Sequence, residues 1–326
     1  MTVLITGAAG YIGSHMAYEL LDAGEKIVAL DDLSTGFEWL VPRQVPFIKG
    51  NAGDPALLAG IIKEHGVDSI IHFAASISVP QSFADPLGYY WNNTVNAHAL
   101  IACAIEHGIR HFIFSSTSAV YGSAVPTPTP ETAATEPESP YGWSKLITER
   151  MLRDTGDAAG LRYAILRYFN ASGADPGLRT GQVAVDTGHL IKVAVETALG
   201  KRPAMDVFGT DYPTPDGSCI RDYIHVSDLV AAHSGALRYL RAGGASQILN
   251  CGYGAGYSVL QVIEAVKRVT GSDFKVKLGP RRPGDRPVSI AAPDRARALL
   301  GWNPRYDNLD TIIGHTAAWQ RQLAAR

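Results

Sequence analysis

A glycine-rich turn near the start of the chain constrains the fold more than any other feature. An apolar run, Val3–Ile5, precedes the turn, and a helical pattern over residues 11–21 follows it. The turn itself contains Gly7, Gly10 and Gly13. Glycine tolerates the tight path from a strand into a helix, and its missing side chain lets backbone N–H groups approach a pyrophosphate at the helix N-terminus. The pattern predicts a strand–turn–helix unit that opens a nucleotide-binding domain.

The first half of the chain alternates between short β-branched runs and helical patterns. Strands are expected at Val3–Thr6, Ile27–Asp31, Phe47–Lys49, Ser69–Phe73, His111–Ser115 and Tyr163–Tyr168. Helices are expected at Gly13–Ala23, Pro55–Glu64, Tyr90–His107 and Tyr141–Thr155. Such alternation predicts an α/β fold with a Rossmann-like, doubly wound parallel sheet. Its ligand is expected beyond the carboxyl ends of the strands, where the strand order reverses.

The second half has a different pattern, which indicates a second lobe. The chain has 326 residues, whereas one domain usually has about 150. The strand–helix rhythm ends near Asn170, and loops rich in Gly and Pro follow at 171–181, 209–217 and 279–287. We expect a Rossmann domain over residues 1–169 and a smaller mixed α/β lobe for substrate over 170–326. Segments near 224–250 are candidates to return to the main sheet.

Charge and cysteine usage exclude several classes of protein. The formal net charge is −2, so no large basic field attracts nucleic acid or an anionic membrane. No window approaches the ~18 consecutive apolar residues of a transmembrane helix. The three cysteines lie far apart, and neither they nor the histidines have the spacing of a disulfide framework or a metal site. We expect a cytoplasmic protein that binds neither nucleic acid, membrane nor metal.

An acidic residue at the end of the second expected strand indicates which dinucleotide is bound. Asp31 closes that strand, and a carboxylate there accepts hydrogen bonds from both hydroxyls of an adenosine ribose. It also repels a 2′-phosphate, and the following residues 32–35 supply no Arg to neutralise one. The sequence therefore favours NAD over NADP. The alternative is a Gly-rich turn that binds nothing.

The pair Tyr141 and Lys145 indicates acid–base chemistry. The two residues are four apart, so on a helix they share a face. An ammonium and a nicotinamide beside a phenol lower its pKa until it works as a base. Together with the glycine turn, this pair predicts an enzyme with a nicotinamide site. The alternative is an amphipathic helix on which the tyrosine packs and the lysine is solvated.

Several segments carry a resemblance that extends from residue 2 to about residue 320. They include Thr6–Gly13, Asp31–Gly36, His72–Ala75, Ser115–Gly122, Tyr141–Lys145 and Arg167–Asn170. Together they resemble the extended short-chain dehydrogenase/reductase family. Segments 209–226 (GTDYPTPDGSCIRDYIHV) and 280–287 (PRRPGDRP) are similar to its UDP-glucose 4-epimerase branch. A Tyr-x-x-x-Lys pair alone marks only the superfamily, whereas the first of these two segments is much more specific.

The resemblance implies NAD-dependent 4-epimerisation of UDP-hexoses through a transient 4-keto sugar, with the cofactor retained. It implies Tyr141 as the base, Lys145 as its cationic neighbour and Thr117 as a hydroxyl that passes the O4 proton. It implies cofactor contacts from Gly7, Gly10, Tyr11, Ile12, Gly13, Asp31, Asp32, Leu33, Ser34, Thr35, Gly36, Asn51, Ala52, Phe73, Ala74, Ala75, Asn92, Ser115, Tyr141, Lys145 and Tyr168. It implies substrate contacts from Thr117, Tyr141, Asn170, His189, Leu190, Phe208, Arg221, Arg282, Asp285 and Ser289. It further implies a homodimer formed through helices near 90–107 and 141–155.

Five positions depart from the family pattern. Asn51 replaces an Asp that faces the adenine, and Asp32 replaces a common Asn. The other three, Ile77, His189 and Ser289, alter the sugar cavity. Serine at position 289 takes the place of a tyrosine in some members, and it is expected to leave space for an N-acetyl group on C2. The departures therefore affect substrate identity more than reaction type.

Two other functions remain open on this scaffold. The first is another nucleotide-sugar reaction by a 4,6-dehydratase, a decarboxylase or a reductase. A dehydratase needs an acid–base pair beside Thr117, but the neighbours here are Ser116 and Ser118, without a carboxylate. The second is an NAD-binding regulator without catalysis, which would not need Thr117, Tyr141 and Lys145 together.

Overall fold

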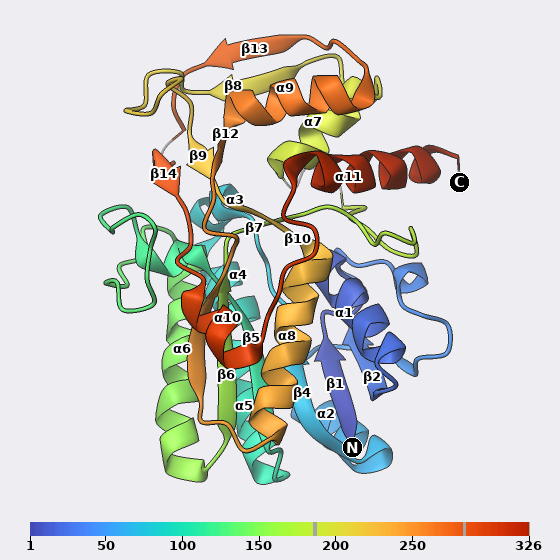
Figure 1. Cartoon of the computed structure of the whole chain (residues 1–326). Helices are drawn as coiled ribbons and strands as arrows, with labels where there is room; N and C mark the ends of the chain where they lie inside the picture. Colours follow the sequence, from blue (N-terminus) through green and yellow to red (C-terminus); the bar gives the residue numbers. More distant parts are fainter. Residues whose placement is uncertain (185–187, 283–284, 326) are drawn as a thin grey trace.

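A seven-stranded parallel sheet forms the centre of the molecule (Figure 1). The computed structural model describes residues 1–184, 188–282 and 285–325. The strand order is β11-β6-β5-β4-β1-β2-β3. The strands are β1 (Thr2–Thr6), β2 (Lys26–Asp31), β3 (Phe47–Lys49), β4 (Val67–His72), β5 (His111–Thr117), β6 (Arg162–Tyr168) and β11 (Gln247–Cys251). The predicted doubly wound α/β fold is confirmed, and every strand expected in the first half lies within two residues of its predicted bounds.

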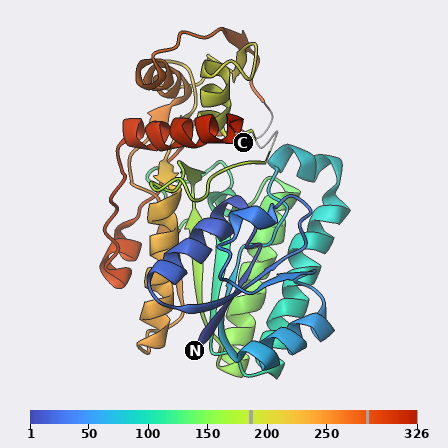
Figure 2. The ribbon, with the colours of Figure 1, turned by 90° about the vertical axis from the view of Figure 1, so that its right-hand side faces the viewer.

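Helices cover both faces of the sheet (Figure 2). One face carries α1 (Tyr11–Asp22) and α8 (Val226–Arg241), and the other carries α2 (Pro55–His65), α5 (Asn96–Glu106) and α6 (Pro140–Ala159). Successive side chains of β1 point to opposite faces, so Val3 and Ile5 join one apolar cluster while Leu4 joins the other. The sheet is therefore buried on both sides, as its continuous apolar strands require.

The sequence determines the helix ends locally. At the start of α6 the Ser139 hydroxyl accepts a hydrogen bond from the Gly142 N–H at 3.1 Å, and Pro140 occupies the first helical position. The helix ends at Gly160, which has a left-handed conformation with φ of 70°. The single helix expected over 90–107 is instead a π-helix, η2 (Tyr90–Val95), followed by α5. Two short helices, α3 (Val79–Ala84) and α4 (Pro86–Tyr89), precede it.

A second group of elements lies beyond the carboxyl ends of the strands, at the top of Figure 1. It contains a parallel pair, β8 (Met205–Phe208) with β13 (Val276–Gly279), and the sheet β12 (Tyr257–Ser258), β9 (Ile220–Arg221) and β14 (Val288–Ser289). Its helices are α7 (Leu190–Ala198), α9 (Val259–Thr270) and α11 (Leu309–Ala324). The pair β7 (Asn170–Ser172) and β10 (Tyr223–His225) leads into it, and α10 (Asp294–Leu300) packs on α8. Although they come late in the chain, α8 and β11 belong to the main sheet layer.

The strand order reverses between β1 and β4. From β1 the chain continues outward through β2 and β3, and then returns to β4 on the other side of β1. The connections after β1 and β4 therefore diverge, which opens a crevice at their carboxyl ends. No helix within the described residues is long and apolar enough to cross a membrane.

Candidate active site

The glycine turn lies at this crevice, and its backbone is too crowded for side chains. Gly7 has φ of +69°, and a Cβ there would lie 2.6 Å from the Ala74 backbone nitrogen, at the end of β4. A Cβ at Gly13 would overlap the Gly7 carbonyl oxygen. Gly10 is the N-cap of α1, and among the described residues no side chain caps this helix. The backbone N–H groups of the first turn are therefore available for an anion, as a pyrophosphate requires.

Asp31 is held rigidly at the end of β2, beside the glycine turn. One carboxylate oxygen accepts a hydrogen bond from the Ala9 N–H at 2.9 Å, and the other accepts from the Leu33 N–H at 2.8 Å. Burial raises the pKa of Asp31, and the two backbone donors oppose that shift. The carboxylate is thus fixed close to the turn, where a ribose attached to the pyrophosphate would lie. The arrangement fits the predicted adenosine dinucleotide.

The remaining predicted cofactor residues lie around the same crevice or behind it. The Phe73 N–H donates to the Thr6 carbonyl at 3.0 Å, which brings Phe73, Ala74 and Ala75 next to the glycine turn. Asn92 donates from its side-chain amide to the Ser76 hydroxyl at 2.9 Å. The exposed Asn51 accepts from the Gly53 N–H at 2.7 Å, so its oxygen already has a local partner. Ala52 is buried beside it.

Three buried side chains from two elements form the candidate reaction centre. Tyr141 and Lys145 lie on the same face of α6, and Thr117 ends β5. The Tyr141 and Thr117 side chains are hydrogen-bonded to each other. The Lys145 ammonium donates to the Ser115 carbonyl at 3.0 Å, and the Ser115 hydroxyl donates to the Tyr168 hydroxyl at 3.0 Å. The structure therefore brings all of the predicted catalytic residues together.

Burial controls the pKa values of the reaction centre. Burial raises the pKa of the Tyr141 phenol well above its usual value, Tyr168 adds to the shift, and the hydrogen bond to Thr117 opposes it. Burial also lowers the pKa of Lys145 to about 7, while the Glu149 carboxylate acts in the opposite direction. The expectation that the phenol has a low pKa is therefore not met by the protein alone. A further positive charge is needed to favour the phenolate.

Most predicted substrate residues gather where β9 and β14 pair. Arg221 on β9 lies opposite Ser289 on β14. The Asp285 carboxylate forms ion pairs with two guanidinium groups. Its oxygens lie 3.6 Å from Arg221 Nη2 and 3.0 Å from Arg282 Nε. The Arg282 guanidinium also lies 4.6 Å from the centre of the Phe208 ring. These residues form an arginine pair on a shared carboxylate, a suitable site for a diphosphate.

Asp222 has a structural role next to the arginine pair. This buried carboxylate accepts backbone hydrogen bonds from Tyr253, Gly254 and Ala291 at 2.9, 3.0 and 3.2 Å. It therefore holds the loops around the substrate lobe, and Asp285 is the carboxylate paired with Arg221. The Asp222 carbonyl accepts from both the backbone and side-chain N–H groups of Asn170 at 3.0 and 3.1 Å, which places Asn170 beside β9.

His189 and Leu190 lie at the start of α7. His189 Nδ1 is 2.6 Å from the Gln182 side-chain nitrogen; with that nitrogen assigned as the donor, Nδ1 accepts and Nε2 carries the proton. Burial and the Lys192 charge lower the pKa of His189 to about 4, so the ring is neutral at pH 7. Leu190 is half-buried against the core. His189 thus presents an N–H donor, as the amide of an asparagine would.

Ser289 and Ile77, two residues that depart from the family pattern at the sugar cavity, differ in their surroundings. Ser289 is only 3% exposed, and its hydroxyl accepts a hydrogen bond from Arg286 Nη2 at 3.1 Å. The space next to this serine, which the sequence led us to expect to be open, therefore contains a guanidinium group. Ile77 is 51% exposed and precedes α3.

Sequence reasoning missed two charged residues next to the site. Glu149 is four residues after Lys145 on the same face of α6, and it accepts from the Ser116 hydroxyl at 2.5 Å and forms a buried ion pair with Arg167. The helical spacing of Tyr141, Lys145 and Glu149 was the signal that could have revealed it. The local sequence could not have revealed where Arg286 points, because its two carbonyl partners, Gly122 and Ser118, are more than 160 residues away.

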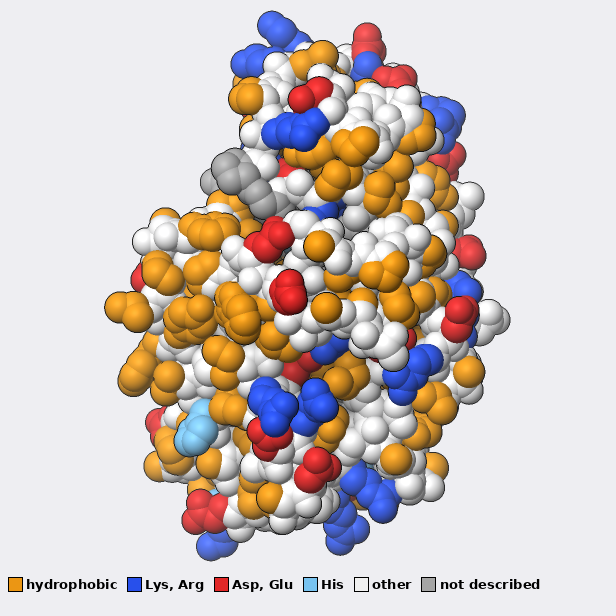
Figure 3. All heavy atoms as spheres, turned by 90° about the vertical axis from the view of Figure 1, so that its left-hand side faces the viewer, with side chains coloured by type: hydrophobic (Ala, Val, Ile, Leu, Met, Phe, Trp, Pro, Cys, Tyr) orange, Lys and Arg blue, Asp and Glu red, His pale blue; other side chains and the backbone are white. Residues whose placement is uncertain are grey.

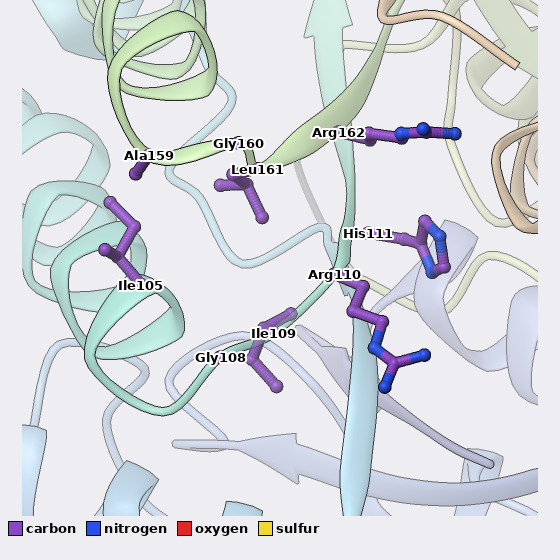
Figure 4. Close-up of a pocket in the computed structure, with 9 residues that line it drawn as sticks. All are labelled: Ile105, Gly108, Ile109, Arg110, His111, Ala159, Gly160, Leu161 and Arg162. Carbon is purple, nitrogen blue, oxygen red and sulfur yellow. The ribbon is translucent and has the colours of Figure 1, made fainter. Parts of the chain in front are cut away.

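One pocket outside this region lies at the opposite end of the sheet. Its volume is about 390 Å³, and it is formed where β5 and β6 begin. Figure 4 shows Arg110, His111 and Arg162 on one side of it and apolar residues, including Ile105 and Leu161, on the other. None of the predicted site residues lines this pocket. Within the described parts of the chain, no group of three His, Cys, Asp or Glu residues could hold a metal ion.

Comparison with known proteins identifies the family. Residues 3–252 match the model of the NAD dependent epimerase/dehydratase family. The chain is 51% identical to a UDP-glucose 4-epimerase from Azospirillum brasilense, over 98% of this chain and 92% of that protein. It is also similar to two solved structures. One is a UDP-glucose 4-epimerase from Stenotrophomonas maltophila with bound NAD and formylated UDP-arabinopyranose, with a TM-score of 0.96 and 38% identity over 100% of this chain and 99% of that one. The other is the UDP-Glc/GlcNAc 4-epimerase from Campylobacter jejuni, with a TM-score of 0.86 and 44% identity over 98% and 99%.

These matches extend over nearly the whole chain, and they agree with the glycine turn, the Tyr141–Lys145 pair and the sheet order. The chain therefore belongs to the NAD-dependent epimerase/dehydratase family.

Proposed function

We propose that this protein is an NAD-dependent 4-epimerase of UDP-hexoses that interconverts UDP-glucose and UDP-galactose. The observation that carries the proposal is the buried group of Thr117, Tyr141 and Lys145 at the carboxyl end of β5, in a chain that also has the glycine turn and the arginine pair of Arg221 and Arg282. The similarity to UDP-glucose 4-epimerases over nearly the full length supports the same reaction. The turn around Gly7 would hold the pyrophosphate of NAD, and Asp31 would hold its adenosine ribose.

Inversion at C4 of a hexose needs the removal of a hydride from carbon and of a proton from O4. NAD⁺, when bound, supplies the hydride acceptor and a positive charge beside the phenol. Tyr141 takes the O4 proton through the Thr117 hydroxyl, to which it is hydrogen-bonded. Lys145, held on the Ser115 carbonyl, favours the phenolate by its charge. The 4-keto sugar then turns over, and as the hydride returns to the other face of C4, Tyr141 returns the proton to O4.

The arginine pair would hold the nucleotide while the sugar turns. Arg221 and Arg282 share one carboxylate, so the pair carries a net positive charge that a diphosphate can balance. Charged hydrogen bonds of this kind are about twice as strong as neutral ones. A tight grip on the diphosphate, with few contacts to the sugar, allows both faces of the 4-keto sugar to reach the cofactor.

The purified protein is expected to convert UDP-galactose to UDP-glucose without added NAD. The catalytic cycle returns the cofactor to its initial oxidation state, so it has no need to leave. Product analysis after gel filtration checks the activity, and the ultraviolet spectrum of the denatured protein's supernatant checks for the dinucleotide. A protein that purifies without a dinucleotide and depends on added NADP would contradict the proposal.

We further propose that two copies form a homodimer through an apolar face. Exposed apolar side chains cluster over α3, α4, η2 and α6, and Figure 3 shows hydrophobic side chains gathered on this face. They are Ile77, Val79, Phe83, Leu87, Trp91, Val95, Trp143 and Ile147. Monomers rarely expose contiguous apolar patches larger than a few hundred Å². An isologous dimer would cover the patch on both copies with one interface.

The variant Leu87→Glu is expected to be monomeric. Leu87 is 79% exposed on α4, and a carboxylate there would be buried without a partner at the dimer interface. Light scattering after size exclusion should give a mass near the 34.9 kDa of one chain for the variant and twice that for the wild type. Leu278→Glu, at a leucine on β13 that is 67% exposed, is the matched control and should stay dimeric. A monomeric wild type would contradict the dimer.

We propose the cytoplasm as the location. Cys103, Cys219 and Cys251 are all buried and free, as suits a reducing compartment.

A further inference from the structure

One partly buried cation near the reaction centre has no role in the reaction described above. Arg286 lies just before β14, and its guanidinium extends to the turn that follows Thr117. Nη1 donates to the Gly122 carbonyl at 2.7 Å, and Nη2 lies 3.4 Å from the Ser118 carbonyl and 3.1 Å from the Ser289 hydroxyl. The guanidinium therefore lies between the end of the catalytic strand and the predicted sugar residue Ser289.

Arg286 differs from the arginines of the diphosphate site in its ion pairing. Arg221 and Arg282 share the Asp285 carboxylate, but among the described residues no carboxylate pairs with Arg286. Burial and the nearby Arg221 lower the pKa of Arg286 to about 10, with Glu138 acting in the opposite direction. Its partners are two carbonyls and a hydroxyl, and its Nε has none among the described residues. An oxygen acceptor on a ligand would stabilise a guanidinium that has only neutral hydrogen-bond partners.

The position of Arg286 indicates which part of the ligand would supply that oxygen. A sugar whose O4 meets Thr117 and Tyr141 places its other substituents over the residues next to Thr117. Arg286 Nη2 lies 3.4 Å from the carbonyl oxygen of Ser118, the residue that directly follows Thr117 in the chain. The plain hydroxyls of a hexose satisfy a guanidinium weakly, whereas an amide carbonyl or a carboxylate is a strong acceptor.

We propose that Arg286 is a specificity-determining residue that binds an acyl oxygen on the hexose, either the carbonyl of a C2 acetamido group or a C6 carboxylate. The inference rests on the proposed 4-epimerase function. In this arrangement the choice of substrate depends mainly on the Arg286 guanidinium. The small size of Ser289 has less effect than the hydrogen bond by which its hydroxyl holds that guanidinium. The wild type should accept at least one class of acyl-bearing UDP-hexose in addition to the plain hexoses.

The test compares kcat/KM for three substrates: UDP-galactose, UDP-N-acetylgalactosamine and UDP-galacturonate. The variant Arg286→Met keeps most of the side-chain volume but removes the charge and the donors. The measured ratio is kcat/KM for an acyl-bearing substrate divided by kcat/KM for UDP-galactose. We expect the variant to lower this ratio by about tenfold or more, the effect of losing a hydrogen bond from a charged donor. Arg286→Lys keeps the charge and should retain part of the preference. The substrate whose ratio falls identifies the acyl group as an acetamide or a carboxylate.

Two further variants test the arrangement. Ser289→Tyr replaces the hydroxyl by a ring that displaces the guanidinium, so it should lower the same ratio. Arg281→Met is the matched control, because Arg281 is an exposed arginine of the same segment, paired with Asp211, and its loss should leave the ratio unchanged. Circular dichroism of each variant checks its folding.

Each remaining outcome has a definite meaning. The inference is wrong if the wild type converts neither acyl-bearing substrate, or if Arg286→Met leaves the ratio unchanged. It is also wrong if Arg286→Met weakens UDP binding by the same factor as it lowers kcat/KM, because Arg286 would then be a diphosphate ligand. A wild type that fails to convert UDP-galactose would instead contradict the proposed function.

Discussion

Tyr141→Phe is expected to lower kcat for UDP-galactose by on the order of 10²-fold or more, the loss that follows removal of a positioned acid–base group. The change removes only the phenol oxygen, which contacts Thr117 and would take the O4 proton. The ring remains in its buried place on α6. The arginine pair lies on other elements, so the dissociation constant for UDP should change by less than about threefold. Steady-state kinetics and titration calorimetry measure the two quantities separately.

Tyr163→Phe is the matched control for this variant. Tyr163 is also a buried tyrosine, but it lies at the amino end of β6, far from the carboxyl ends that form the site. Its kcat should stay close to that of the wild type. If Tyr141→Phe keeps near-full activity, the phenol is not the base and the mechanism is wrong.

Lys145→Met should also lower kcat by about 10²-fold, and in addition it should change the pH profile. Methionine fills the volume of the lysine stem, but it removes the ammonium from the Ser115 carbonyl. The phenol then loses a cation that favours its ionised form, so its pKa rises. We therefore expect the pH profile of kcat/KM of the variant to be displaced to higher pH than that of the wild type.

The shift of the profile separates an electrostatic role of Lys145 from a purely structural one. A variant damaged only in packing would lose activity equally at every pH. Lys201→Met serves as the control, because Lys201 donates to the Gln320 carbonyl at 2.8 Å in the second lobe and has no contact with α6. An unchanged profile in Lys145→Met would show that its ammonium does not act on the phenol.

Both variants depend on a contact that the spacing of the motif predicted well. Residues four apart on a helix share a face, so Tyr141 and Lys145 were expected together, and the structure places both against the end of β5. The same spacing extends to Glu149, which the motif did not include. The spacing gave no sign of how strongly burial raises the pKa of Tyr141 in the protein itself, because that shift depends on how completely distant parts of the chain exclude water.

The substrate lobe was predicted less well than the nucleotide domain. Its residues were identified by resemblance, but their partners follow from packing between separate segments. Asp222 is adjacent to Arg221 in the sequence, yet its carboxylate points to the loop at 253–254, and Arg221 pairs with Asp285. Neighbouring residues on a strand point to opposite faces, so adjacency along the chain gives no contact there.

Local chemistry in the sequence alone determined the strands of the first half, the glycine turn with Asp31, and the shared face of Tyr141 and Lys145. These features depend on interactions over a few residues: the two helical and strand periodicities, the freedom of glycine and the capping of helix ends. The sequence named segments near 224–250 only as candidates to return to the sheet, and the tertiary structure decided where β11 pairs and that β1 meets β4. The tertiary structure alone also placed Arg286 against Ser118, 168 residues earlier in the chain. Such contacts join segments that no local pattern relates, and their geometry comes from the packing of the whole core.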